Sequence, residues 1–360
     1  MKGLTRRRFA AIAGVVVLAT LTAGATGCGS GEPEARGDSP EASQTGASDG
    51  GDSTQGLVPV NVGVMTGNLD QSLVAIGRER GTFEGHGLDV RVSEYAAGIN
   101  TVDAIVTGQN DIGLLADYAA VNRLGNTSDS TDLRLFVNYQ RSHITKLYVN
   151  PDRVKTVGDL AGQGFVTLPG TVWDYWVGKT YEYAGISEAD RDVINVDSAQ
   201  DALGVLTRGD GVAFWASGAN ASKLEEAGFE PILTMDDLGI FVDSYFVSTS
   251  AYLDANPQVA QRFLEALREI EEWVEGNLDE AGRVVEGQTT QPADQFVENV
   301  KQFTLSTSLG QDAIDHLNDI KDWARDAGKF ENDFEVTDFI DTKPLEDAGL
   351  AGSDALNYSE

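Results

Sequence analysis

From Leu57 onward, short apolar runs alternate with stretches whose apolar residues recur every three or four positions. The short runs predict buried strands, and the recurring spacing predicts amphipathic helices. We therefore expect strands over residues 58–64, 88–92 and 111–115, with helices over residues 69–80 and 101–107 between them. This alternation is typical of right-handed strand–helix–strand units around a mainly parallel sheet.

The same pattern returns after Lys146. Here we expect strands over residues 164–168, 193–196 and 212–215, and helices over residues 172–184 and 199–207. Two helix–turn segments also echo each other, because residues 103–111 read DAIVTGQND and residues 201–210 read DALGVLTRGD. The sequence therefore predicts an α/β protein built from two similar lobes.

The pattern becomes helical beyond Asp254, where Asn256 and Pro257 are a helix start signal. Five apolar residues then follow at helical spacing, and we expect all of them in the core: Val259, Phe263, Leu267, Ile270 and Val274. Helical material is expected to continue to about Ala327 as a helical C-terminal part.

The N-terminal residues are typical of an export signal. Lys2 and the arginines at 6–8 precede an apolar run that is shorter than the roughly 20 residues needed to cross a bilayer. We therefore expect a signal peptide over residues 1–28 rather than a membrane span. The motif TRRRF fits the twin-arginine route, and the general secretory route is the alternative.

Cys28 ends this segment and is the only cysteine, so no disulfide forms within the chain. The motif ATGC resembles the lipobox of bacterial lipoproteins, which implies that Cys28 carries lipid and anchors the protein on the outside of the cell membrane. Residues 29–55 contain no aromatic residue and no Val, Leu or Ile. This composition cannot bury a core, so we expect a disordered tether over residues 29–56.

The chain is strongly acidic. Its formal net charge is −31, which becomes −35 once the four cations of the signal are removed. Such a surface repels nucleic acid and anionic lipid headgroups. We therefore expect no nucleic-acid partner and no membrane contact other than the lipid anchor.

Five stretches of the chain resemble one family. Residues 75–115 read AIGRERGTFEGHGLDVRVSEYAAGINTVDAIVTGQNDIGLL and resemble the first lobe of solute-binding proteins of ABC importers in the nitrate, sulfonate, taurine and thiamine-precursor group. The matching positions are Gly81, Phe83, Glu84, Gly87, Leu88, Asp89, Val90, Gly98, Ala104, Gly108 and Asp111. Residues 157–176 and 209–229 are similar to the second lobe of the same family, residues 241–267 to the crossing segment after it, and residues 339–350 to its closing segment.

The resemblance implies a type II periplasmic-binding fold, with ligand held between two lobes that two extended crossings join. The first lobe is expected over residues 58–145 plus 243–349 and the second over residues 146–242, with crossings near 146–149 and 243–247. It also implies an exported monomer without cofactor or metal that delivers a small molecule to permease and ATPase subunits.

The candidate ligand contacts lie on loops at the carboxyl ends of the predicted strands, where helix starts offer backbone N–H groups. The resemblance selects the same loops. From the first lobe the candidates are Thr66, Asn68, Asp70, Tyr95, Gly98, Asp117, Tyr118 and Arg141. From the second lobe and the crossing after it they are Gly170, Thr171, Trp173, Asp174, Trp215 and Asp243.

These residues leave two ligand classes open. Gly98 and Gly170 before helices, with Arg141, fit an anion such as a sulfonate, taurine or nitrate. The four acids among the candidates, together with the aromatic side chains, fit a cationic or heteroaromatic ligand such as a thiamine-precursor pyrimidine.

Catalysis is not indicated by the sequence. Of the three histidines, His86 and His316 are expected at the surface, and His143 has no nearby nucleophile except Ser142. We therefore expect a binding protein, with a ligand sensor or an enzyme on the same fold as the alternatives.

Overall fold

The computed structural model describes residues 56–330, 332–352 and 356–357. The predicted signal peptide, Cys28 and most of the tether lie outside these residues. Within the described part of the chain, no helix is both long enough and apolar enough to cross a membrane.

The first third of the described chain alternates strands and helices as expected. Its elements are β1 (Val58–Met65), α1 (Leu69–Glu79), α2 (Thr82–Gly85), β2 (Leu88–Tyr95), α3 (Gly98–Val106), β3 (Gly113–Ala116), α4 (Asp117–Thr127) and β4 (Leu133–Ser142). The strands β1 and β2 pair in parallel, and a bridge between Val62 and Ile112 joins β1 to the segment before β3.

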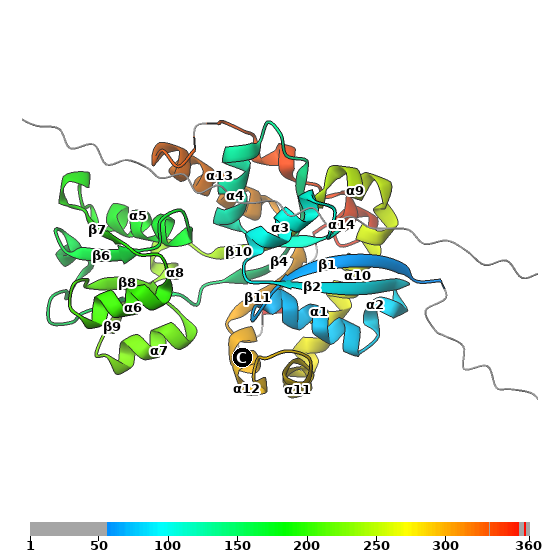
Figure 1. Cartoon of the computed structure of the whole chain (residues 1–360), viewed down its shortest axis with the longest axis horizontal. Coiled ribbons are helices and arrows are strands. Elements are labelled where there is room, and N and C mark those ends of the chain that lie inside the picture. Colours follow the sequence, from blue (N-terminus) through cyan, green and yellow to red (C-terminus); the bar gives the residue numbers. More distant parts are fainter. Residues whose placement is uncertain (1–55, 331, 353–355, 358–360) are drawn as a thin grey trace, which may run out of the picture. The chain divides into compact units, whose positions relative to one another are not determined.

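The middle third forms a second sheet with the strand order β7-β6-β8-β5-β9. Its elements are β5 (Lys146–Val149), β6 (Gly164–Thr167), α5 (Val172–Ala184), β7 (Asp192–Asn195), α6 (Ala199–Thr207), β8 (Ala213–Ala216), α7 (Gly218–Glu226), β9 (Glu230–Thr234) and α8 (Met235–Leu238). Figure 1 shows α5 on one face of this sheet and α6 with α7 on the other.

The last third returns to the first sheet and then becomes mainly helical. Its elements are β10 (Val242–Thr249), α9 (Ser250–Ala255), α10 (Pro257–Gly276), α11 (Leu278–Gln288), α12 (Ala293–Val300), β11 (Phe303–Ser308), α13 (Gln311–Asp326), α14 (Lys343–Asp347) and β12 (Leu356–Asn357). The strands β12-β11-β4-β10-β3 form one sheet in that order, and all of its pairs are antiparallel, so the expectation of a mainly parallel sheet is wrong for this sheet. The five apolar residues expected in the core of α10 are all buried, which confirms that prediction.

The chain passes between the two sheets twice. The first passage, over residues 143–145, connects β4 to β5, and the second, over residues 239–241, connects α8 to β10 (Figure 1). The crossings predicted at 146–149 and 243–247 are therefore wrong by a few residues. Those residues are themselves strand β5 and part of strand β10, because both runs are apolar enough to be paired inside a sheet.

Apolar residues fill both faces of the second sheet. Leu147 and Trp215 belong to the cluster that α5 covers, whereas Tyr148 and Phe214 belong to the cluster under α6 and α7. Successive side chains of a strand point to opposite faces, so both members of the Phe214–Trp215 pair are fully buried.

Helix α13 packs against both α4 and α5. The ring of Trp323 lies 6.4 Å from that of Tyr118 on α4 and 5.3 Å from that of Tyr175 on α5, between ring centroids. Gly178 makes this approach possible, because a Cβ atom there would lie 2.3 Å from the Trp323 ring. The sequence alone did not indicate that this late helix would contact the middle third of the chain.

Candidate functional site

A cavity of about 510 Å³ opens where several of the predicted loops meet. It is lined by Met65 at the end of β1 and Asn68 before α1, by residues 97–99 at the start of α3, by β3 and one side of α4, by residues 170–172 at the start of α5, and by Ser244 of β10. This volume suits a small organic molecule.

The start of α3 gives this cavity two backbone donors. The residue before the helix is Ala97, which has no side-chain acceptor, and the first turn contains no acid. The N–H groups of Gly98 and Ile99 have no hydrogen-bond partner among the described residues, and both residues line the cavity. Because helix N-termini carry partial positive charge, these N–H groups can bind an anion.

The first turn of α3 is fixed tightly against β3. The Thr101 hydroxyl accepts a hydrogen bond from the Leu114 N–H at 2.8 Å and lies 2.8 Å from the Gly98 carbonyl, to which it donates. A Cβ atom on Gly98 would lie 3.1 Å from the Leu114 carbonyl oxygen. Glycine therefore allows this helix start to lie directly on the strand that forms the cavity wall.

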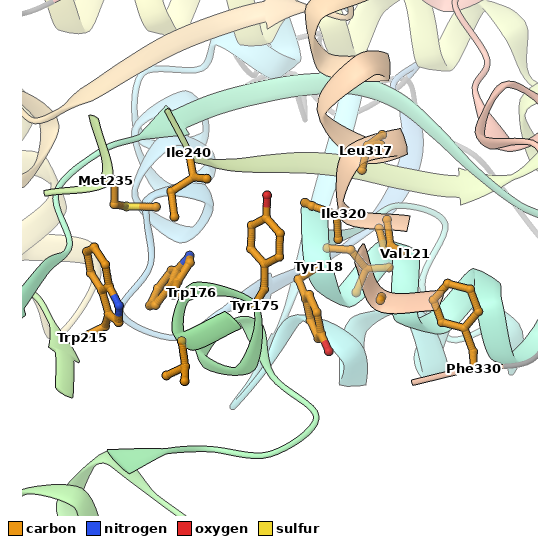
Figure 2. Packing of buried hydrophobic residues seen from close by; sticks show 14 of the residues in the cluster. Tyr118, Val121, Tyr175, Trp176, Trp215, Met235, Ile240, Leu317, Ile320 and Phe330 are labelled. Atoms are coloured by element: carbon orange, nitrogen blue, oxygen red, sulfur yellow. The ribbon is translucent and has the colours of Figure 1, made fainter. Parts of the chain in front are cut away.

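Tyr118 adds a third donor. Its side chain is 2 % exposed and lines the cavity, and its hydroxyl is buried without a hydrogen-bond partner among the described residues. Figure 2 shows this hydroxyl pointing away from Leu317 and Ile320 of α13. Burial, and then the charge of Asp174, raise the pKa of Tyr118 above its ordinary value, so the hydroxyl keeps its proton. A buried donor without a partner carries a desolvation penalty that a ligand acceptor would remove.

The predicted acids do not line this cavity. Asp70 is fully buried, its carboxylate accepts a hydrogen bond from the Met65 N–H at 2.7 Å, and burial raises its pKa to about 7. Asp174 accepts from the Gly170 N–H at 2.9 Å and pairs with Lys329 at 2.7 Å. The backbone N–H that Gly170 was expected to offer a ligand is thus already bound, although Gly170 itself lines the cavity.

Asp117 and Asp243 belong to one buried network beside the second passage between the sheets. Asp117 accepts from the Asp243 N–H at 2.9 Å and from His316 at the same distance, so the expectation that His316 lies at the surface is wrong. Arg141 grips both oxygens of Asp243 at 2.7 and 2.8 Å, and its guanidinium lies 3.7 Å from the ring centroid of Phe241. Burial still raises the pKa of Asp243, although Arg141 acts in the opposite direction.

The two candidate tryptophans are packing residues in this structure. Trp215 is fully buried, and its indole N–H donates to the Thr180 hydroxyl at 3.0 Å. Trp173 donates its indole N–H to the Trp215 carbonyl and stacks on Phe214, with ring centroids 6.2 Å apart. Figure 2 shows Trp215 beside Trp176 in the row of rings that continues to Tyr175 and Tyr118. The expectation that Trp215 faces the ligand is corrected, because the helical layer of α5 covers the strand face on which it lies.

The remaining candidates divide into two groups. Asn68, Gly98, Tyr118, Gly170 and Thr171 are brought together at the cavity wall. Thr66 is exposed outside the wall, and the Tyr95 hydroxyl accepts from the Asn110 amide at 3.2 Å.

The prediction from sequence missed the polar side of α4. Asn122, Arg123 and Asn126 line the cavity, and they follow Tyr118 and Ala119 at helical spacing. This spacing was the available signal, since residues three or four apart from a predicted contact lie on the same face of the helix.

Comparisons with known proteins agree with this geometry. Residues 68–281, more than half of the chain, match the family described as NMT1/THI5 like. The chain belongs to the NMT1/THI5-like family. The family expected from the sequence motifs is thereby confirmed.

One curated relative and two solved structures are similar to this NMT1/THI5-like chain. A putative binding protein from Brucella abortus is 22% identical over 241 residues, which cover 62% of this chain and 69% of the relative. The aliphatic sulphonate binding protein SsuA from Escherichia coli has a TM-score of 0.66 at 15% identity, covering 78% of this chain and 91% of its own. The nitrate-binding protein NrtA from Synechocystis PCC 6803 has a TM-score of 0.60 at 14% identity, covering 81% and 88%. These likenesses confirm the expected periplasmic-binding fold.

Proposed function

We propose that this protein is the exported solute-binding component of an ABC importer and that it captures a small organic anion between its two lobes. The observation that carries the proposal is that several hydrogen-bond donors, and no carboxylates, lie at one cavity. The N–H groups of Gly98 and Ile99 and the hydroxyl of Tyr118 meet at one cavity, and none of its lining residues among the described ones bears a carboxylate.

The electrostatics of the cavity favour an anion over a cation. A cationic or heteroaromatic ligand needs an exposed acid or an aromatic face. Asp70, Asp117 and Asp243 are buried and already accept internal hydrogen bonds. Apolar side chains also line the cavity, with Ile99, Leu114 and Val172 among them, which suits the carbon part of an organic anion.

The relatives support the same ligand class. SsuA is described as an aliphatic sulphonate binding protein and NrtA as a nitrate-binding protein. A sulfonate, taurine or a nitrate-like anion is accordingly the first ligand to test on this chain. Export and anchoring through Cys28, delivery to permease and ATPase subunits, and a monomeric state are parts of the same proposal. Binding without chemistry fits the cavity, because the Ser244 hydroxyl already accepts a hydrogen bond from the Gln140 amide and His316 pairs with Asp117.

A thermal-shift screen followed by calorimetry tests the proposal. Ligands that bind only the folded state raise the melting temperature, so alkanesulfonates, taurine and nitrate should do so and protonated aminopyrimidines should not. A screen in which only the aminopyrimidines raise the melting temperature would overturn the anion proposal.

Tyr118→Phe sharpens the test. The variant keeps the ring and removes the unpartnered hydroxyl, so the affinity for the anion should fall about tenfold, the loss of one hydrogen bond to a charged group. Tyr175→Phe is the matched control, because Tyr175 is equally buried beside Tyr118 but does not line the cavity. Equal effects of the two variants on affinity would remove Tyr118 from the site.

A further inference from the structure

Arg123 is the one cation among the described residues that line the cavity. It lies on α4, and its Nη1 donates to the Asp103 carboxylate on α3 at 3.2 Å. Its Nε is buried and has no hydrogen-bond partner in the described part of the chain. The Arg123 guanidinium therefore binds Asp103 through one nitrogen atom, and its Nε remains available to another acceptor.

Another arginine of the same chain, Arg141, binds acidic side chains through three nitrogen atoms. Arg141 uses Nε and Nη2 together to grip both oxygens of Asp243, and gives Nη1 to Asp312 at 2.8 Å. Arg123 has the same Nη1 contact with an acid but nothing on the Nε–Nη2 side among the described residues. That planar pair of donors matches the two oxygens of a carboxylate or sulfonate.

The neighbouring polar side chains do not compete for this role. The Asn122 amide donates to the Gly170 carbonyl at 3.4 Å, and the Asn126 amide donates back to Asn122 at 2.8 Å. Both are neutral and already engaged. Asp103 is 57 % exposed, so it holds Arg123 from the solvent side.

We propose that the ligand carries a second acid group and that the Nε–Nη2 side of Arg123 binds it. The inference rests on the proposed function, in which the first acid group lies at the start of α3. Asp103 follows Gly98 by five residues on the same helix, a rise of about 7.5 Å. The two positive sites of the cavity are thus separated along α3 by the length of a short carbon chain, and the substrate class is a short two-headed organic acid.

Paired ligands measure the contribution of the second acid directly. Calorimetry at pH 7 compares propane-1-sulfonate with 3-sulfopropanoate, and propanoate with succinate. In the wild-type protein the two-headed member of each pair should bind at least about tenfold more tightly, as a bidentate ion pair at a partly buried site allows.

Arg123→Gln should abolish this preference. Arg208→Gln is the matched control, because Arg208 is exposed and pairs only with Asp210 in the described residues. It removes the same charge and should leave the preference intact. Asp103→Asn should strengthen binding of the two-headed ligand, since it removes a competing and repelling carboxylate from Arg123.

The failures of the two proposals are distinct. If no anion of either kind binds, the proposed function is wrong and this inference falls with it. If one-headed and two-headed ligands bind equally well, only the second acid group is refuted. If the preference persists in Arg123→Gln, a group other than Arg123 binds the second acid.

Discussion

Replacing Trp215 by Ala separates a packing residue from a ligand contact. The side chain is fully buried, its ring lies 6.1 Å from that of Trp176 between centroids, and its indole N–H donates to Thr180. Truncating a buried tryptophan costs about 3–5 kcal/mol through lost burial and the cavity that remains. The structure limits further losses, because Thr180 keeps the hydrogen bond that it donates to the Trp176 carbonyl at 2.7 Å.

We therefore expect Trp215→Ala to lower the free energy of unfolding by about 4 kcal/mol. At about 2 °C per kcal/mol for a chain of this size, the melting temperature should fall by about 8 °C. The affinity of the folded protein for its ligand should stay within about threefold, because the indole does not line the cavity.

Circular dichroism measures the melting temperature, and calorimetry below the unfolding transition measures the affinity for the ligand. Tyr183→Ala is the control, since Tyr183 is 56% exposed and its truncation should change the melting temperature by less than about 2 °C. The reasoning is refuted if Trp215→Ala melts like the wild-type protein and binds ligand at least tenfold more weakly.

Three further predictions concern other parts of the chain. Gly178→Ala should lower the melting temperature by several degrees, because its Cβ would lie 2.3 Å from the Trp323 ring, and unchanged melting would show that α13 and α5 are not in close contact. Burial raises the pKa of Glu271 to about 8 from an ordinary value of 4.5, so the stability that its neutral form contributes is complete below pH 4.5 and is lost as the pH rises through 8. Glu271→Gln should flatten this fall in melting temperature between pH 5 and 8.5, and an unchanged pH profile would contradict it. Cys28→Ser should release the protein from the membrane fraction, as judged by fractionation and immunoblotting, whereas retention would exclude Cys28 as the lipid-bearing residue.

Much of the fold follows from local pattern. The predicted helices over residues 172–184 and 199–207 agree with α5 and α6 to the residue, because Thr171 and Ser198 supply N-cap oxygens directly before them. Strand β11 was not predicted, since residues 303–308 read FTLSTS and are half polar. It forms because β4 offers an unpaired edge to which the segment hydrogen-bonds, and a segment's own sequence does not specify such a partner.

Five of the candidate contacts predicted from sequence lie at one cavity, whereas the candidate acids and tryptophans do not line it. Gly98 and Tyr118 could be placed because carboxyl ends of strands and helix starts meet at one edge of a sheet. The role of Trp215 could not be predicted. A side chain at the end of a strand contacts a ligand if it points to one face of the sheet and packs in the core if it points to the other. Only the placement of α5 over that face decides between them.

The aspartates at helix starts show the same limit of prediction from sequence, and they bear on the choice of ligand. An aspartate at a helix start can point outward to a ligand or inward to neighbouring backbone N–H groups, and the sequence is identical in both cases. Here Asp70 and Asp117 accept from the Met65 and Asp243 N–H groups, and thereby fix the ends of β1 and β10 against α1 and α4. Helix α3, by contrast, begins without an acid in its first turn. The proposed anion site therefore depends on acids that are turned away from the cavity, and it is compatible with a net charge of −31 for the whole chain.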